Sequence, residues 1–148
     1  MRRSLTFSVV VVAAVAAGVS AQRSPAVGIR ALANVRELHD IMISPASDAV
    51  FAASSSQPLD AKGWTDARNQ AILLAESGNL LMVGTRVRDT GNWMKMSRAM
   101  VDAAALAATA AEKKDAKALE AATDSITTAC MECHRPYRDG GRQMGAPK

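Results

Sequence analysis

Four segments of helix-forming residues make up most of this chain, and clusters of turn-forming residues separate them. Alanine dominates the 148 residues, with leucine, methionine and long charged residues in support, while strand-like alternation of β-branched residues is nearly absent. Within each segment apolar residues recur every three or four positions, which predicts a helix with one buried face. Four such helices with short connections favour an all-α fold, an antiparallel four-helix bundle.

Helix-breaking and helix-capping residues set the expected boundaries. The pair Ser44-Pro45 is expected to end or bend the first helix, because a residue before proline is pushed out of the helical region. Asp60 and Asp115 are predicted N-caps of later helices. The helices are predicted over about residues 27–43 with a continuation over 46–53, then over 61–83, 92–113 and 116–137. Their buried faces are expected to include Leu32, Leu38, Trp64, Leu74, Trp93, Met100, Leu119 and Ile126.

The N-terminal sequence has the order of a secretory signal peptide. Arg2 and Arg3 precede an apolar run over residues 9–19, and small residues follow at Val19-Ser20-Ala21. This pattern predicts cleavage after Ala21 and export to the periplasm. The run is shorter than the roughly 20 residues that a membrane span requires. No stable membrane span is therefore expected, and an uncleaved anchor is the alternative.

Removal of the signal peptide, residues 1–21, leaves enough chain for one domain. This domain is expected over residues 22–138, with a short mobile tail over 139–148. Loss of Arg2 and Arg3 lowers the formal net charge of +4 by two. A charge this mild, with few aromatic residues, argues against a nucleic-acid-binding protein.

The chemistry of the chain is carried by Cys130-Met131-Glu132-Cys133-His134, close to the C-terminus. This sequence has the form C-x-x-C-H, the attachment site of a c-type haem. On a helix, positions 130, 133 and 134 fall at about 0°, 300° and 40° around the axis, so they share one face. Both thiols can then add to the vinyl groups of one porphyrin, and His134 can bind the iron as proximal ligand. One covalent haem c on the last helix is predicted.

Three other uses of the two cysteines fit less well. A disulfide between them would close a loop of only a few residues and stabilise little. A thioredoxin-like redox pair should open a helix after a strand, whereas this pair ends a helix. A zinc site would need a further ligand, and His39 is the only other histidine in the chain.

The sequence leaves open which group faces the iron from the side opposite His134. His39 and Met42 are three positions apart on the first predicted helix, so both can face an attached haem. His39 is the first candidate for the distal ligand, Met42 is the alternative, and an open five-coordinate iron is the third reading. The choice decides between electron transfer and small-ligand binding.

Arginine residues supply positive charge for the surroundings of such a haem. Arg30 and Arg36 could pair with the haem propionates, because guanidinium and carboxylate groups match bidentately. Arg135, Arg138 and Arg142 follow the motif and could form a basic collar that steers an acidic redox partner. In both cases an ordinary solvated surface is the alternative. No nucleophile stands with a general base in the sequence, so no enzymatic activity is predicted.

These features resemble the class II c-type cytochromes, the cytochrome c-prime family. The haem motif lies at the C-terminal end of four helical segments, and Arg135-Pro136-Tyr137-Arg138 is similar to the family's aromatic-Arg ending. The resemblance implies a left-handed bundle, haem c, and a first helix that supplies the residue over the distal face. A histidine at position 39 and the absence of lysine between the cysteines depart from the family's usual pattern.

Residues and resemblance together predict a periplasmic monohaem cytochrome that carries single electrons. The alternative function is a five-coordinate haem module that binds NO or CO. Redox partner proteins are the expected partners, a homodimer is a further expectation from the resemblance, and nucleic acid is not expected.

Overall fold

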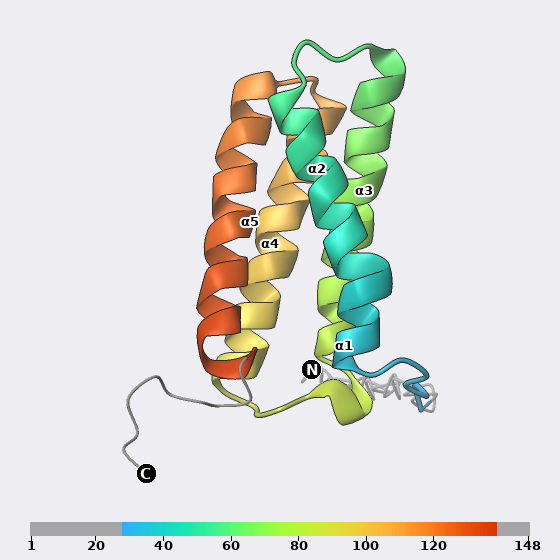
Figure 1. Cartoon of the computed structure of the whole chain (residues 1–148), viewed down its shortest axis with the longest axis vertical. Helices are drawn as coiled ribbons and strands as arrows, with labels where there is room; N and C mark the ends of the chain where they lie inside the picture. The colour runs from blue at the N-terminus through green and yellow to red at the C-terminus, as the bar shows by residue number, and fades with distance from the viewer. Residues whose placement is uncertain (1–27, 139–148) are drawn as a thin grey trace, which may run out of the picture.

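The computed structural model describes residues 28–138, and within that range all regular structure is helical. Four long helical units run up and down beside one another (Figure 1), which confirms the predicted all-α antiparallel bundle. The expected signal peptide and C-terminal tail lie outside the described residues. The first unit consists of α1 (Val35–Leu38), η1 (His39–Ile43) and α2 (Ser44–Ser55), which follow one another without a break. The other three units are α3 (Ala61–Leu81), α4 (Asn92–Glu112) and α5 (Ala116–Tyr137). A short 3-10 turn, η2 (Gly84–Arg86), lies between α3 and α4.

The first helix begins later than predicted, at a capping box. The side chain of Asn34 accepts the N–H of Glu37 at 3.0 Å, and the Glu37 carboxylate accepts the N–H of Asn34 at 2.8 Å. Together they satisfy backbone donors that the first turn leaves without partners. The prediction of helix before Asn34 is therefore wrong. Leu32, which was expected to be buried, is 82% exposed.

The first helix continues through Ser44-Pro45 by way of a π-helical turn, η1. The N–H of Ser44 donates to the carbonyl of His39, five residues earlier. Pro45 has no N–H to donate, and its ring crowds the carbonyl four residues before it. A widened turn just before the proline accommodates both effects, and α2 follows without interruption. The sequence thus predicted an irregularity at Ser44-Pro45, and the structure shows that it is a π-helical turn.

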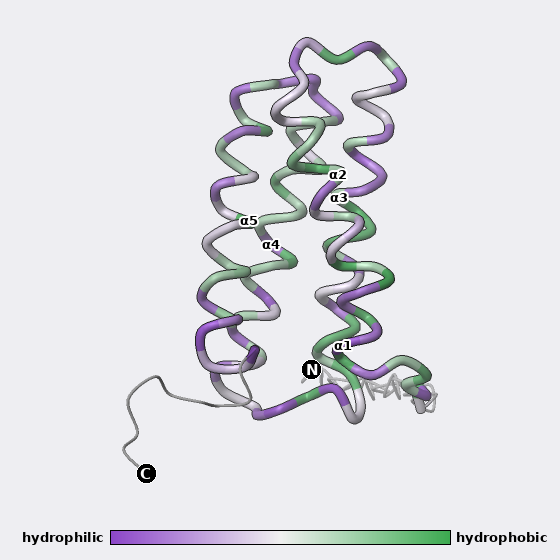
Figure 2. Tube along the Cα trace, viewed as in Figure 1, coloured by the Kyte–Doolittle hydropathy of each residue, from purple (hydrophilic) through white to green (hydrophobic). Residues whose placement is uncertain are grey.

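The core is built largely from alanine and a few larger side chains. Hydrophobic positions on the four units alternate with polar ones along each trace, as Figure 2 shows. At the contact between α3 and α4, a Cβ on Gly78 would lie 2.6 Å from a methyl carbon of Val101, so the small residue permits the close approach. Seven larger residues of the predicted faces are buried, namely Leu38, Trp64, Leu74, Trp93, Met100, Leu119 and Ile126, whereas Val35, Met42, Met82 and Met96 on those faces are only half-buried.

One end of the bundle is held together by the connection between α3 and α4. Arg86 is only 6% exposed, and its guanidinium donates to the carbonyls of Ala33 at 2.9 Å and Leu80 at 3.3 Å. The indole N–H of Trp93 donates to the carbonyl of Leu81 at 2.8 Å. These bonds tie the segment before α1, the end of α3 and the start of α4 at the end where α5 also finishes. None of the helices within residues 28–138 is long and apolar enough to cross a membrane.

Candidate functional site

A cavity of about 770 Å³ lies at that same end of the bundle. Its volume is in the range of sites that bind cofactors and small ligands. All four helical units contribute to its walls. The lining includes Arg36, His39, Ile43 and Ser44 from the first unit, Leu81 and Arg88 from α3 and the following loop, Trp93, Met96, Ser97 and Met100 from α4, and Ala129, Cys130, Cys133, His134 and Tyr137 from α5.

Cys130, Cys133 and His134 line one wall of this cavity from a single face of α5, as their spacing predicts. All three side chains are half-buried, and the two thiols are not joined in a disulfide. Burial raises the pKa of both thiols, and the neighbouring Cys130 adds to the effect on Cys133. Both groups are therefore protonated thiols at neutral pH.

His39 faces His134 across the cavity, although the two are 95 residues apart in sequence. Their Nε2 atoms are 3.2 Å apart, and the ring centroids are separated by 5.3 Å. A hydrogen bond between two imidazole nitrogens requires one of them to carry the proton. The tertiary structure thus aligns the ring nitrogens of the predicted proximal and distal residues.

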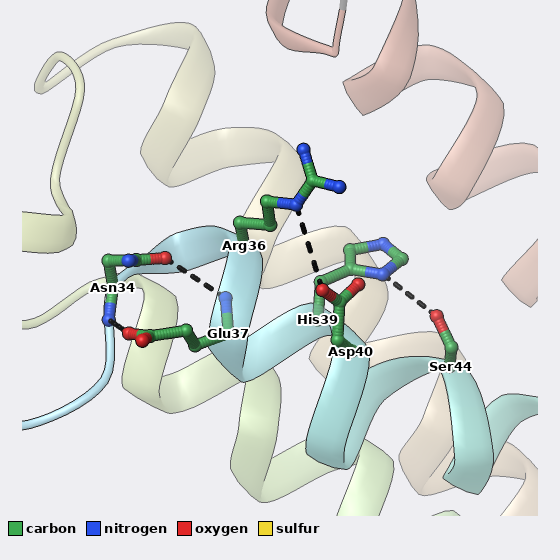
Figure 3. A network of polar contacts seen from close by, with 6 residues as sticks. All are labelled: Asn34, Arg36, Glu37, His39, Asp40 and Ser44. Atoms are coloured by element: carbon green, nitrogen blue, oxygen red, sulfur yellow. Dashed lines mark hydrogen bonds and ion pairs between the residues drawn. The ribbon is translucent and has the colours of Figure 1, made fainter.

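The second ring nitrogen of His39 is also engaged. Nδ1 lies 2.9 Å from the hydroxyl oxygen of Ser44, as Figure 3 shows. Ser44 was noticed in the sequence only as the residue before Pro45. Because the π-helical turn brings residue 44 over residue 39, the structure gives it a place at the site that sequence spacing does not.

The inner wall of the cavity is apolar apart from one hydroxyl. Ser97 is 1% exposed, and its Oγ has no hydrogen-bond partner within the described part of the chain. Hydroxyls elsewhere on the helices donate to a carbonyl of the preceding turn, as Ser77 does to Leu73 at 2.6 Å. An unpaired buried hydroxyl costs free energy, so the Ser97 side chain is suited to a polar group on whatever occupies the cavity.

The other predicted site residues divide between the cavity and the outer surface. Arg36 lines the cavity and forms an ion pair with Asp40 at 3.7 Å, with its side chain 90% exposed (Figure 3). Arg30 is exposed and Met42 half-buried, and neither lines the cavity. In the proposed collar, Arg138 lines the cavity, whereas Arg135 pairs with Glu132 at 2.6 Å on the same helix. Arg142 lies outside the described residues.

Tyr137 closes the rim of the cavity and was not predicted as a site residue. Its hydroxyl donates to the carboxylate of Asp89 in a short hydrogen bond, and its ring packs edge-on against Trp93 with centroids 5.0 Å apart. Asp89 also accepts the N–H groups of Gly91 and Trp93 at the start of α4. The hydrogen bond raises the pKa of Tyr137 to about 12 and lowers that of Asp89. The pair fastens the end of α5 to the start of α4.

The fold defines a class of protein, the four-helix bundles, in which cofactor sites are built from side chains on facing helices. Residues 88–138 match the family model described as Cytochrome C', which confirms the predicted resemblance to that family. The match covers α4, α5 and the C-x-x-C-H sequence, and it implies a haem cofactor. The first helical unit and α3 lie outside the matched residues. No curated protein and no solved structure matches the chain.

The residues around the cavity fit a haem. Two metal–imidazole bonds of about 2.0 Å each would separate the ligating nitrogens by about 4 Å. The Nε2 atoms of His39 and His134 are 3.2 Å apart, so they would have to separate by less than about 1 Å to reach that distance. The apolar inner wall suits a porphyrin ring, and the arginine side chains suit its carboxylates. Within residues 28–138 no three His, Cys, Asp or Glu side chains are grouped to hold a metal ion.

Proposed function

We propose that this protein is a periplasmic monohaem c-type cytochrome that carries single electrons and is not an enzyme. The observation that carries the proposal is the alignment of His39 and His134 across a cavity that also presents two thiols. When bound, a haem supplies one-electron chemistry at its iron.

Cys130 and Cys133 would attach the haem through thioether bonds, each thiol S–H adding across one vinyl C=C bond with no leaving group. His134 would hold the iron from the side of α5. Because three groups on one helix face bind the same ring, the haem is fixed in one orientation.

His39 is the distal ligand in this proposal, in preference to Met42. Its Nε2 atom points at His134 Nε2, whereas Met42 does not line the cavity. Ligation by two imidazoles gives a low-spin iron with a lower reduction potential than a His/Met pair, because methionine ligation raises the potential. With His134 and His39 both bound to the iron, the protein would exchange electrons without binding a substrate.

The arginine side chains of the cavity rim would hold the propionates. Arg36, Arg88 and Arg138 line the cavity, which supports this role. Their charges keep the carboxylates at the exposed mouth while the apolar inner wall excludes water from the ring. The mouth is then the place where a redox partner protein approaches.

Export to the periplasm is proposed on the signal-like sequence that ends at Ala21. Haem attachment through C-x-x-C-H is consistent with that compartment. A redox partner protein and a homodimer stay predictions.

Visible spectra of the oxidised, reduced and CO-treated reduced protein test this proposal. The wild-type protein should show sharp low-spin reduced bands that CO leaves unchanged at concentrations that would saturate an open iron. His39→Ala should open the iron, so that CO shifts the Soret band, and Met42→Ala should behave as wild type.

Each contrary result has its own meaning. A wild-type protein that binds CO at once would support the five-coordinate gas-binding alternative. A Met42→Ala variant that opens to CO while His39→Ala stays closed would make Met42 the distal ligand.

A further inference from the structure

We infer that Ser44 is a positioning residue for the distal ligand, and that its hydroxyl accepts a hydrogen bond from Nδ1–H of His39. The inference rests on the proposed function, because it assumes that His39 binds the iron through Nε2. It adds a residue that acts through His39 and does not itself contact the iron.

The contact depends on the π-helical turn. In a regular α-helix, residues five apart lie about 140° from each other around the axis, so their side chains diverge. In η1 the N–H of Ser44 donates to the carbonyl of His39, which places residue 44 one turn above residue 39. The two side chains then meet, with Nδ1 and Oγ 2.9 Å apart.

The bond suits the form of the imidazole that can bind iron through Nε2. A serine hydroxyl can accept a hydrogen bond, and a neutral imidazole carries its proton on one nitrogen only. With the proton on Nδ1 and shared with Ser44, the lone pair of His39 is on Nε2, the atom that faces His134. Ligation through Nε2 therefore leaves the proton on Nδ1, and the bond to Ser44 then holds the ring in the direction that faces His134.

A bond of this kind has a known effect on metal ligands. An imidazole that donates its second N–H is a more basic ligand, and removal of the acceptor typically weakens metal binding by about 10- to 100-fold. A more basic ligand stabilises the ferric iron more than the ferrous iron. Loss of the Ser44 hydroxyl should therefore weaken the bond from His39 to the iron and raise the reduction potential.

The test compares Ser44→Ala with two matched variants in the haem-loaded protein. Ser44→Thr keeps a hydroxyl at the same position. Ser47→Ala removes a neighbouring half-buried serine whose hydroxyl donates only to the backbone carbonyl of Ser44. The readouts are the reduction potential and the CO concentration that converts half of the ferrous protein to the CO form.

Ser44→Ala should lower that CO concentration by about 10- to 100-fold and raise the potential, whereas Ser44→Thr and Ser47→Ala should stay close to wild type. If Ser44→Ala matches wild type in both readouts while His39→Ala opens the iron to CO, the positioning role is wrong and His39 ligation stands. If His39→Ala itself leaves the response to CO unchanged, ligation by His39 fails, and the inference about Ser44 fails with it.

Discussion

The two walls of the cavity are built in different ways. The α5 wall carries both thiols and one imidazole within five consecutive positions of a long regular helix. The facing wall depends on a five-residue π-helical turn, on a proline that follows it, and on the packing of the first helix against the rest of the bundle. The family match covers only the α5 wall and its neighbour α4. One half of the site is thus encoded locally, and the other half by tertiary structure.

The largest expected effect is on the α5 wall. Replacement of Cys130 and Cys133 together by alanine should abolish covalent haem, because no other cysteine exists in the chain. Extraction with acidified acetone should remove haem from the double variant and leave it on wild type. Met131→Ala, between the two cysteines, is the control and should retain haem. Wild-type haem that leaves on extraction would contradict covalent attachment.

A substitution in the facing wall should raise the stability of the protein while it weakens the binding of His39 to the iron. Pro45→Ala restores a backbone donor inside the first helix, so the protein should gain stability, by up to about 3 kcal/mol. A regular helix would also turn Ser44 away from His39, so CO should bind the ferrous protein more readily. Urea unfolding and CO titration measure the two effects. The double variant Ser44→Ala/Pro45→Ala should bind CO no better than Ser44→Ala, and stronger binding would mean that the proline acts by another route.

Because the hydroxyl of Ser97 is unpaired, Ser97→Ala should affect the stability of the haem-free and the haem-loaded protein differently. In haem-free protein, Ser97→Ala removes a buried hydroxyl without a partner, so stability should rise by about 1 kcal/mol. In haem-loaded protein that gain should disappear if the hydroxyl bonds to the bound group. Ser77→Ala is the control, because it loses an existing hydrogen bond and should gain stability in neither form. Equal gains for Ser97→Ala in both forms would show that its hydroxyl has no partner on the haem.

The smallest expected effect concerns the Tyr137–Asp89 bond, which joins the end of α5 to the segment just before α4, both within the residues that the family model matches. The pKa of Asp89 is lowered in the folded protein, so its contribution is present above the ordinary value of 3.8 and is lost as the pH falls through the folded value. Tyr137 has a raised pKa, so its contribution is lost only as the pH rises through about 12. Thermal melts of wild type and Tyr137→Phe should therefore differ slightly at neutral pH and converge in acid. A difference that persists far below pH 3.8 would contradict this account.

The sequence predicted the later helices well for identifiable reasons. They are long and strongly periodic, and Asp60 and Asp115 cap them as expected by accepting the N–H groups of Gly63 and Ala118. The start of the first helix was placed too early because Leu32 continues the apolar spacing although it lies on the surface. The Asn34 to Glu37 spacing was the signal that could have corrected it.

Only the part of the site that depends on the spacing of nearby residues could be predicted from the sequence. The face shared by Cys130 and His134 follows from helix geometry alone, and His39 could be named because few residue types bind iron. The roles of Ser44, Ser97 and the buried Arg86 depend on which segments meet in space. The spacing of apolar residues does not show such contacts, because Ser44 meets His39 only through a π-helical turn and Arg86 bonds to Ala33, which is many residues away in sequence.

The position of the cavity has a consequence for how the protein matures. It lies where the chain enters α1, crosses from α3 to α4 and leaves α5, while the opposite end of the bundle is closed by the α2–α3 and α4–α5 connections around tightly packed alanine. The alanine-packed end can therefore fold before the haem binds. Haem binding then completes the folding of the bundle and does not initiate it. In hydrogen exchange of the haem-free chain, amides beside the α4–α5 connection should stay protected while those around the cavity exchange freely, so that the unfinished protein is a bundle open at one end.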